Sequence, residues 1–277
     1  MKTFGRVLTA MITSFNDDGS VNIENTVAIA QHLLDHGSDG LVVCGTTGEN
    51  PTMSRESKIA LFKAIAESCG DKGTIIANVG SNDTKGSVYF VKEVSAIPGI
   101  DGLLVVVPYY NKPNQQGQYL HFRSIAEATT LPIMVYNVPG RVGTGIFPAT
   151  LARLHKEYPH ICAIKEASGN LMIASEIKRL MPGDDFMVYS GDDGLTLPIL
   201  SVGGTGVISV VSHVAGQDMN DMIAAFEEGD NQKATQLHQK LAEITKAMFI
   251  TTNPIPVKYA ARKLGLPAGI FNLPMCE

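Results

Sequence analysis

Short apolar runs recur along the chain, and segments whose apolar residues have helical spacing separate them. The runs predict buried strands, because a strand covered by helices on both faces has no polar side. They comprise residues 5–13, 40–44, 74–79, 102–107, 132–137, 161–165, 186–190 and 206–210. Between the second and third runs, apolar residues from Ile59 to Cys69 fall on one face after a Ser54 cap, which predicts a helix.

Eight such strand–helix repeats predict a (β/α)₈ TIM barrel. The doubly wound alternative is less favoured, because the first strand is not followed by a GxGxxG turn. Beyond residue 211 the pattern changes, because 217–228 and 231–251 have helical spacing with no strand between them. Asn253-Pro254-Ile255-Pro256 then interrupts the chain before another predicted helix at 257–264. We therefore expect a catalytic barrel at residues 1–211 and a C-terminal helical region at 212–277.

Composition narrows the function to small-molecule chemistry. The 277 residues are 44% hydrophobic, with a net charge of −5 that is spread without long charge runs. This balance gives no electrostatic basis for binding nucleic acid or an anionic membrane. No signal-type stretch follows the N-terminus and no segment reaches the length of a membrane span. We expect a cytoplasmic protein.

Cysteines and histidines predict neither disulfides nor a metal site. Cys44, Cys69, Cys162 and Cys276 are far apart and form no CxxC pair, so we interpret them as reduced residues of the core. His32 and His36 have helical i, i+4 spacing, but no carboxylate motif accompanies them, so a surface helix is the better interpretation.

Lys165 is the most informative residue, because it ends the apolar run that begins at Ile161. Burial disfavours the charged form of an amine, and a neutral amine is a nucleophile. A lysine at a strand end can equally extend its amine to solvent, and for an isolated lysine this interpretation is the better one. The other strand ends reverse that judgement.

Reactive side chains follow three other predicted strands. Thr46 and Thr47 follow the second, Tyr110 the fourth, and the fifth ends at Tyr136 shortly before Arg141. Each has an ordinary structural interpretation when taken alone, but in a barrel of this type the chemistry lies where strands end. A neutral lysine attacks a ketone to give an iminium, phenols transfer the protons, and arginine binds a carboxylate. Pyruvate is the natural small donor for this chemistry.

With these residues, the chain resembles the pyruvate-dependent class I aldolases of the dihydrodipicolinate synthase and N-acetylneuraminate lyase group. The resemblance runs over nearly the whole chain. It is carried by Gly45-Thr46-Thr47-Gly48-Glu49, Pro108-Tyr109-Tyr110-Asn111, Tyr136-Asn137-Val138-Pro139-Gly140-Arg141, Ile164-Lys165-Glu166-Ala167 and Asn253-Pro254-Ile255-Pro256-Val257-Lys258. Arg141 makes the chain resemble the synthase branch of this group, because the lyases for sugar acids lack an arginine at this position. That branch condenses pyruvate with aspartate semialdehyde to 4-hydroxy-tetrahydrodipicolinate, toward diaminopimelate and lysine, without a cofactor.

The resemblance implies a role for each catalytic residue. Lys165 would form the Schiff base with pyruvate, and Thr47 with neighbouring backbone amides would bind the pyruvate carboxylate. Tyr136 would be the main acid–base group. Thr46 would link Tyr136 to Tyr110, which in the family enters the site from the neighbouring subunit of a tight dimer.

The resemblance also implies how the second substrate and the assembly are handled. Arg141 would bind the carboxylate of aspartate semialdehyde, while Gly191 and Ile208 would line the pocket. The family assembles as a dimer of dimers, a homotetramer. The chain stops at Leu273-Pro274-Met275-Cys276-Glu277, where family members usually continue through one more helix, so a dimer or a looser tetramer is the alternative.

Departures from the family pattern leave the mechanism intact but affect regulation. Ser14, Asn78 and Val107 replace residues that are usually proline, glycine and threonine, and none has a role in the mechanism. In lysine-inhibited members, histidines and a glutamate occupy positions that align with Arg55, Lys58 and Gly86 in this chain. Two cations and a missing carboxylate repel the ammonium groups of lysine, so we expect weak or absent feedback by lysine.

Three alternative functions remain open at this point. A related lyase that cleaves a sugar keto acid such as N-acetylneuraminate would share the lysine and the tyrosine. A phosphate-binding barrel would use Gly203-Gly204-Thr205-Gly206 near the last strands, although a simple turn is the better interpretation of these glycines. A keto-acid sensor without turnover would not need this set of reactive side chains.

Overall fold

Eight parallel strands close into a barrel in the structure, a computed structural model that describes residues 4–277. The strands are β1 (Val7–Ala10), β2 (Gly40–Val43), β3 (Thr74–Asn78), β4 (Gly102–Val106), β5 (Ile133–Asn137), β6 (Ile161–Glu166), β7 (Met187–Ser190) and β8 (Gly206–Ser209). Each predicted run contains one strand, and the observed ends differ from the predicted ends by a few residues at most. The predicted (β/α)₈ barrel is confirmed.

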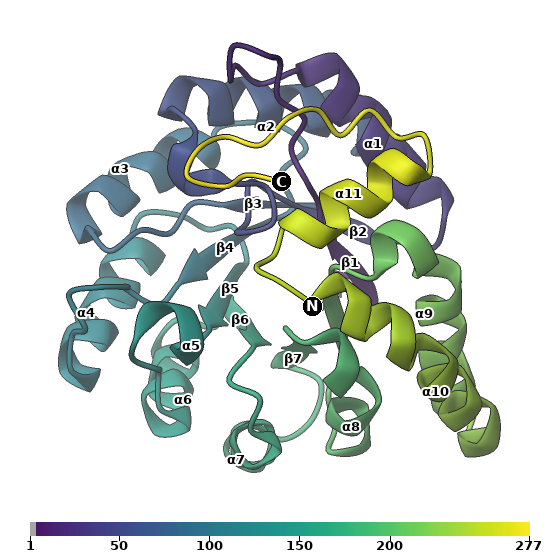
Figure 1. Cartoon of the computed structure of the whole chain (residues 1–277). Helices are drawn as coiled ribbons and strands as arrows, with labels where there is room; N and C mark the ends of the chain where they lie inside the picture. The colour runs from purple at the N-terminus through teal and green to yellow at the C-terminus, as the bar shows by residue number, and fades with distance from the viewer. Residues whose placement is uncertain (1–3) are drawn as a thin grey trace.

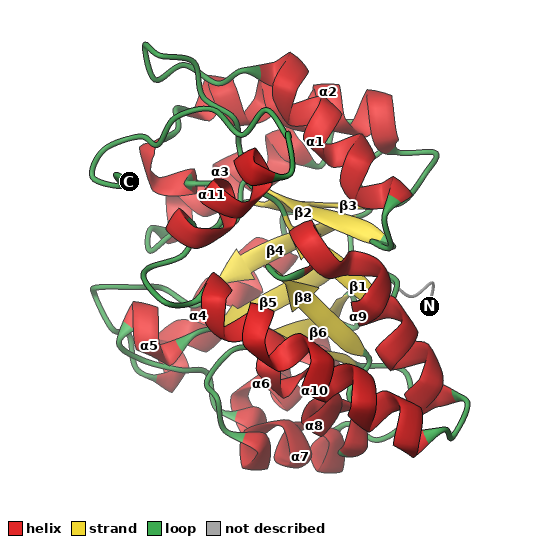
Figure 2. Cartoon of the chain, turned by 45° about the vertical axis from the view of Figure 1, so that its right-hand side comes forward, coloured by secondary structure: helices red, strands yellow, loops and turns green. Residues whose placement is uncertain are grey.

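Helices surround the strands on the outside of the barrel (Figure 2). Those between β1 and β8 are α1 (Ile23–Asp35), α2 (Arg55–Cys69), α3 (Thr84–Val94), α4 (Gln115–Ala126), α5 (Pro139–Val142), α6 (Pro148–Glu157), α7 (Leu171–Leu180) and α8 (Thr196–Ser201), with short 3₁₀ turns η1 (Asn50–Thr52) and η2 (Asp193–Leu195). The strands are buried because helices cover them, which is why their sequences read as continuous apolar runs.

α2 begins and ends where its sequence predicts. The Ser54 hydroxyl accepts a hydrogen bond from the Ser57 N–H at 3.1 Å, which caps the first turn. Phe62, Ile65 and Cys69 of the apolar stripe are buried against the core. Local sequence therefore determines both the length and the orientation of this helix.

The region after β8 contains α9 (Ser212–Glu227), α10 (Asn231–Met248) and α11 (Ile255–Lys263), in agreement with the three predicted helices. α9 begins five residues before the predicted start and contacts both α10 and β1. α11 and the last residues of the chain cross in front of the strands in the yellow part of Figure 1. The C-terminal region thus lies over one end of the barrel.

Three of the four cysteines lie in the core, as expected. Cys44, Cys69 and Cys162 are buried, whereas Cys276 is exposed. The core interpretation is wrong for Cys276, because the chain end that carries it runs over the surface. No helix formed by residues 4–277 is long and apolar enough to cross a bilayer.

His213 joins the two strands that close the barrel. Its Nε2 accepts a hydrogen bond from the Ile12 N–H at 3.2 Å, and its Nδ1 lies 2.8 Å from the Val210 carbonyl oxygen. Both contacts require a neutral ring with the proton on Nδ1. Burial lowers the pKa of His213 to about 4 from an ordinary value of 6.5. The folded protein therefore resists protonation of a group that the unfolded chain protonates readily.

We predict that His213 makes the protein sensitive to acid. Its depressed pKa contributes stability that is complete above about pH 6.5 and is lost as the pH falls toward 4. A difference of this size corresponds to about 3 kcal/mol. Urea unfolding at a series of pH values measures this. Between pH 6.5 and pH 4, the free energy of unfolding of the unchanged protein should fall by about 3 kcal/mol more than that of His213→Gln.

The comparison isolates His213 because other buried groups remain the same in both proteins. His121, whose pKa burial also lowers to about 4, titrates in the same direction. Asp193, whose pKa burial raises to about 6, titrates in the opposite direction. Parallel pH profiles for the two proteins would contradict the prediction.

Candidate active site

One cavity of about 240 Å³ at the carboxyl ends of the strands contains most of the predicted site residues. Since all strands are parallel, their carboxyl ends meet at the same end of the barrel. The lining residues predicted from sequence are Thr46, Thr47, Tyr136, Arg141, Lys165 and Gly191. Residues from the ends of β2, β5, β6 and β7 are thus brought together although they lie far apart in the sequence.

Lys165 is buried in the wall of this cavity, with an exposed fraction of 7%. It lies opposite Tyr136 of β5 in the strand register, and its Nζ is 4.5 Å from the centre of the Tyr136 ring. Among residues 4–277, no carboxylate lies within ion-pair distance of Lys165. An amine in a cavity wall, with no carboxylate partner, can reach a ketone bound in that cavity.

The adjacent carboxylate of Glu166 is held away from Lys165. Its Oε2 accepts a hydrogen bond from Asn137 Nδ2 at 2.7 Å, and its Oε1 accepts one from the Ser168 N–H at 2.6 Å. Successive residues of a strand point to opposite faces, so Glu166 points away from the face that carries Lys165. The strand therefore places an acid and an amine side by side in the sequence without pairing them.

The turn after β2 is suited to binding a carboxylate. The N–H groups of Gly48 and Glu49 donate within the turn, to the carbonyl oxygens of Gly45 and Thr46, both at 3.1 Å. Within the described residues, the N–H groups of Thr46 and Thr47 donate no hydrogen bond. Two unpaired N–H groups beside a hydroxyl offer donors that suit an anion.

Tyr136 lines the cavity beside Lys165 and is 7% exposed. Tyr110 lies outside this cavity and is 89% exposed, with a left-handed backbone (φ 71°). Within residues 4–277, no hydrogen bond joins Thr46 to either tyrosine. The linkage from Tyr136 through Thr46 to Tyr110 therefore remains a prediction.

Gly191 lines the cavity through its backbone. A Cβ at this position would lie 2.5 Å from the Cβ of Ala167, so only glycine fits. Ile208 is buried in β8 but is not among the residues that line the cavity, and Val210 lines it instead. The predicted pocket role of Ile208 therefore rests on the family resemblance.

Asp193 fixes the end of β8 that carries Val210. Its carboxylate accepts hydrogen bonds from the Ser209 hydroxyl and from the N–H groups of Val210 and Val211, the latter two at 3.0 and 3.3 Å. Burial raises the pKa of Asp193 to about 6, although these hydrogen bonds act in the opposite direction. Asp193 is therefore a structural carboxylate beneath the cavity.

Asn253 is a site residue to which sequence reasoning gave no role. Its Nδ2 donates a hydrogen bond to Thr47 Oγ1 at 2.9 Å, while its buried Oδ1 has no partner. Asp192, Val210 and Phe249 also line the cavity. The signal in the sequence was the Asn-Pro-Ile-Pro motif, which carries the resemblance. In the structure its asparagine precedes α11 but makes no side-chain hydrogen bond that caps the helix.

A second cavity of about 230 Å³ adjoins the first and shares Thr46, Tyr136, Val138 and Arg141 with it. It also contains Asn50, Asn78 and Tyr109. Arg141 is exposed and lies between the two spaces, where its guanidinium can meet an anionic substrate.

Two of the departures from the family pattern form hydrogen bonds of their own. The Ser14 N–H donates to Thr26 Oγ1 at 3.1 Å, which a proline could not do. Asn78 Nδ2 donates to the Cys44 carbonyl oxygen at 2.8 Å, which a glycine could not do. Each replacement is thus accommodated by a local contact outside the Lys165 cavity.

The phosphate-binding alternative loses its structural basis. Gly203-Gly204-Thr205 precede β8, so these residues lie at the opposite end of the barrel from Lys165. The Thr205 N–H donates to the Val188 carbonyl oxygen at 2.7 Å, as expected of a structural turn. Residues 4–277 contain no cluster of three or more His, Cys, Asp or Glu side chains that could hold a metal ion.

Comparisons with known proteins agree on one family. A sequence model described as the Dihydrodipicolinate synthetase family matches residues 3–277. The 4-hydroxy-tetrahydrodipicolinate synthase of Moorella thermoacetica is 53% identical over 272 residues, covering 98% of this chain and 92% of the relative.

Solved structures give the same result. Dihydrodipicolinate synthase from Bacillus anthracis is 44% identical, with a TM-score of 0.95 over 99% of this chain and 93% of the other. The enzyme from Cyanidioschyzon merolae, solved with lysine bound, has the same identity, TM-score and coverage. The sequence and the three-dimensional fold therefore lead to the same group of proteins.

Proposed function

This chain belongs to the dihydrodipicolinate synthetase family, and from that premise we propose how its own residues carry out the reaction. It is a lyase of the class I aldolase type that condenses pyruvate with aspartate semialdehyde to 4-hydroxy-tetrahydrodipicolinate, in lysine biosynthesis. The observation that carries the proposed mechanism is the buried Lys165 amine, which faces Tyr136 and has no carboxylate partner in the described chain.

Pyruvate binds first, with its carboxylate on the turn after β2. The free N–H groups of Thr46 and Thr47, together with the Thr47 hydroxyl, donate hydrogen bonds to the carboxylate. Lys165 Nζ then attacks the ketone carbon. A carbon–nitrogen bond forms, the ketone oxygen leaves as water, and the iminium that results withdraws electrons from the neighbouring methyl group.

Tyr136 transfers the protons of these steps, because its ring centre lies 4.5 Å from Lys165 Nζ and it lines the same cavity. It supplies the proton that lets water leave and then removes one from the methyl group to give an enamine. The enamine carbon attacks the aldehyde carbon of aspartate semialdehyde. The amino group of that substrate then replaces Lys165 at the iminium carbon, which closes the ring, so one water is lost overall and the lysine is regenerated.

Arg141 binds the carboxylate of aspartate semialdehyde, and its position between the two cavities supports this role. Gly191 lets the backbone approach the substrate, and the pocket role of Ile208 is proposed from the family resemblance alone. A lyase for sugar keto acids would share Lys165 and Tyr136. Arg141 favours the synthase reaction over that alternative.

The working unit in this proposal is at least a dimer, and a dimer of dimers is the proposed assembly. The exposed Tyr110 supports a dimer, because a phenol that lies outside its own cavity can serve that of a neighbour. The division into a catalytic barrel (1–211) and a helical region (212–277) also stays a proposal. The same is true of a cytoplasmic location, which the buried free thiols support.

We predict that borohydride traps pyruvate on Lys165 and on no other lysine. Reduction of the iminium makes the bond permanent, so peptide mass mapping should find the adduct only in the Lys165 peptide and only with pyruvate present. Lys165→Ala should lose the adduct and at least about a thousandfold in kcat, because the nucleophile is gone.

Lys58 provides the matched control. Burial lowers the pKa of Lys58, so it is another partly desolvated amine near this end of the barrel. Lys58→Met should keep the adduct and the condensation. An adduct on another lysine, or full activity in Lys165→Ala, would overturn the mechanism.

We predict that Tyr110 acts in the neighbouring subunit. Tyr110→Phe and Lys165→Ala should each be impaired alone. Co-expressed in equal amounts, the two variants should recover about a quarter of the wild-type activity, since half of the dimers are mixed and each mixed dimer has one intact site. No recovery in purified mixed dimers would place Tyr110 in its own subunit's site.

We predict that millimolar lysine changes the activity less than about twofold, because Arg55 and Lys58 are cations that repel the ammonium groups of lysine. The ion pair with Glu93 offsets part of the Arg55 charge, whereas Lys58 forms no ion pair in the described chain and Gly86 offers no carboxylate to an ammonium group. The double variant Arg55→His/Lys58→His should gain sensitivity. Strong inhibition of the unchanged enzyme at low lysine concentration would contradict the prediction.

A further inference from the structure

A buried ion pair joins the active-site turn to the C-terminal region. Lys258 of α11 and Glu49 of the turn after β2 have side chains that are 0% and 2% exposed, and Lys258 Nζ lies 2.7 Å from Glu49 Oε1. The other ion pairs formed by residues 4–277 all have side chains that are more than 30% exposed on both sides. Neither Glu49 nor Lys258 lines the cavity, so neither touches the substrate.

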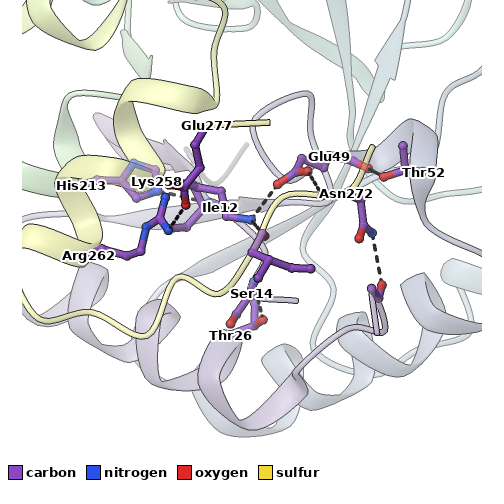
Figure 3. Close-up of polar contacts among 12 residues, drawn as sticks. Ile12, Ser14, Thr26, Glu49, Thr52, His213, Lys258, Arg262, Asn272 and Glu277 are labelled. Atoms are coloured by element: carbon purple, nitrogen blue, oxygen red, sulfur yellow. Dashed lines mark hydrogen bonds and ion pairs between the residues drawn. The ribbon is translucent and has the colours of Figure 1, made fainter. Parts of the chain in front are cut away.

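Each of the two charged groups has further partners besides the other (Figure 3). Lys258 Nζ also donates to the Ile270 carbonyl oxygen, and the rings of Phe15 and Phe271 lie 4.8 and 4.9 Å away. Glu49 Oε2 accepts a hydrogen bond from the Asn272 N–H at 2.9 Å. The pair therefore connects three segments: the turn after β2, α11 and the chain that follows α11.

The position of Glu49 couples this pair to the substrate-binding residues. Glu49 has a left-handed backbone (φ 57°), and its N–H donates to the Thr46 carbonyl oxygen at 3.1 Å. Asn253, just before α11, donates to Thr47 Oγ1 at 2.9 Å. The C-terminal region thus holds the turn at two points, on either side of Gly48. A Cβ on Gly48 would lie 3.0 Å from Thr13 Oγ1, so the turn is also packed closely from below.

Burial of the charges is not explained by stability alone. Two ions lose much of their hydration when they are buried, and well-packed apolar residues usually stabilise a protein at least as much as the pair does. An ion pair is directional, whereas apolar packing is not, because the hydrogen bonds of the pair set the distance and the angle between the groups that they join. This property suits a turn whose free N–H groups must meet a carboxylate.

We infer that Glu49 and Lys258 are positioning residues for the reaction, which hold the turn so that Thr46 and Thr47 can bind the pyruvate carboxylate. The inference rests on the proposed function, since it assigns to this pair the geometry of the pyruvate subsite. It also makes the C-terminal region a part of the active site, although only Asn253 and Phe249 of that region line the cavity.

The test measures how much pyruvate is needed to trap the adduct on Lys165. The double variant Glu49→Gln/Lys258→Met removes both charges while keeping the size of both side chains, so no unpaired ion is left buried. The pyruvate concentration that gives half-maximal trapping by borohydride should rise about tenfold, while the melting temperature changes little. The KM for aspartate semialdehyde should change less than twofold, because Arg141 lies on a different loop.

Two further variants separate positioning from folding. Val257→Ala removes buried side-chain volume from α11 beside Lys258 and should lower the melting temperature without changing the half-maximal pyruvate concentration. Glu49→Asp keeps both charges but shortens the carboxylate side chain by one methylene, so it should show a smaller rise than the double variant, which keeps the test valid if the double variant does not fold.

The outcomes distinguish this inference from the proposed function. If the adduct forms on Lys165 in every variant but the half-maximal pyruvate concentration stays at the wild-type value, only the positioning role fails. An equal rise in Val257→Ala would also overturn it, since any loosening of α11 would then suffice. If the wild-type adduct maps to a residue other than Lys165, the proposed function fails and this inference fails with it.

Discussion

The reaction that we propose depends on a buried lysine amine that has no carboxylate partner. Lys165 meets this condition because β6 is covered by neighbouring strands and helices, and because the adjacent Glu166 is turned to the other face and bonded to Asn137 and Ser168. An amine paired with a carboxylate would hold its proton and could not attack a ketone. β6 thus separates two charged groups that are adjacent in the sequence.

Lys258 is the instructive contrast within the same chain. It is more deeply buried than Lys165, yet it is bonded to Glu49 and to a carbonyl oxygen and lies between two aromatic rings. Burial alone therefore does not make a lysine reactive. In the roles we propose, Lys165 reacts because it has no partner, whereas Lys258 orients other groups through the partners it binds.

The sequence predicted the strands, the barrel and most of the cavity, because each rests on a local pattern. Apolar runs mark strands that are covered on both faces, and in a parallel barrel the residues that end them meet at one end. That reasoning reached Lys165, Tyr136, Thr47 and Arg141. It gave no role to Asn253, whose contact with Thr47 spans 206 residues and has no local pattern to mark it.

By itself the sequence determined the order of the elements, the chemistry available at each strand end and the family, since side-chain type and spacing are properties of the chain. Only the tertiary structure decided which charges are paired. Glu49 and Lys258 meet across 209 residues, while Lys165 and Glu166, adjacent in sequence, do not meet at all. Pairing depends on direction and distance in space, and these arise only when the barrel closes and the C-terminal region packs over it.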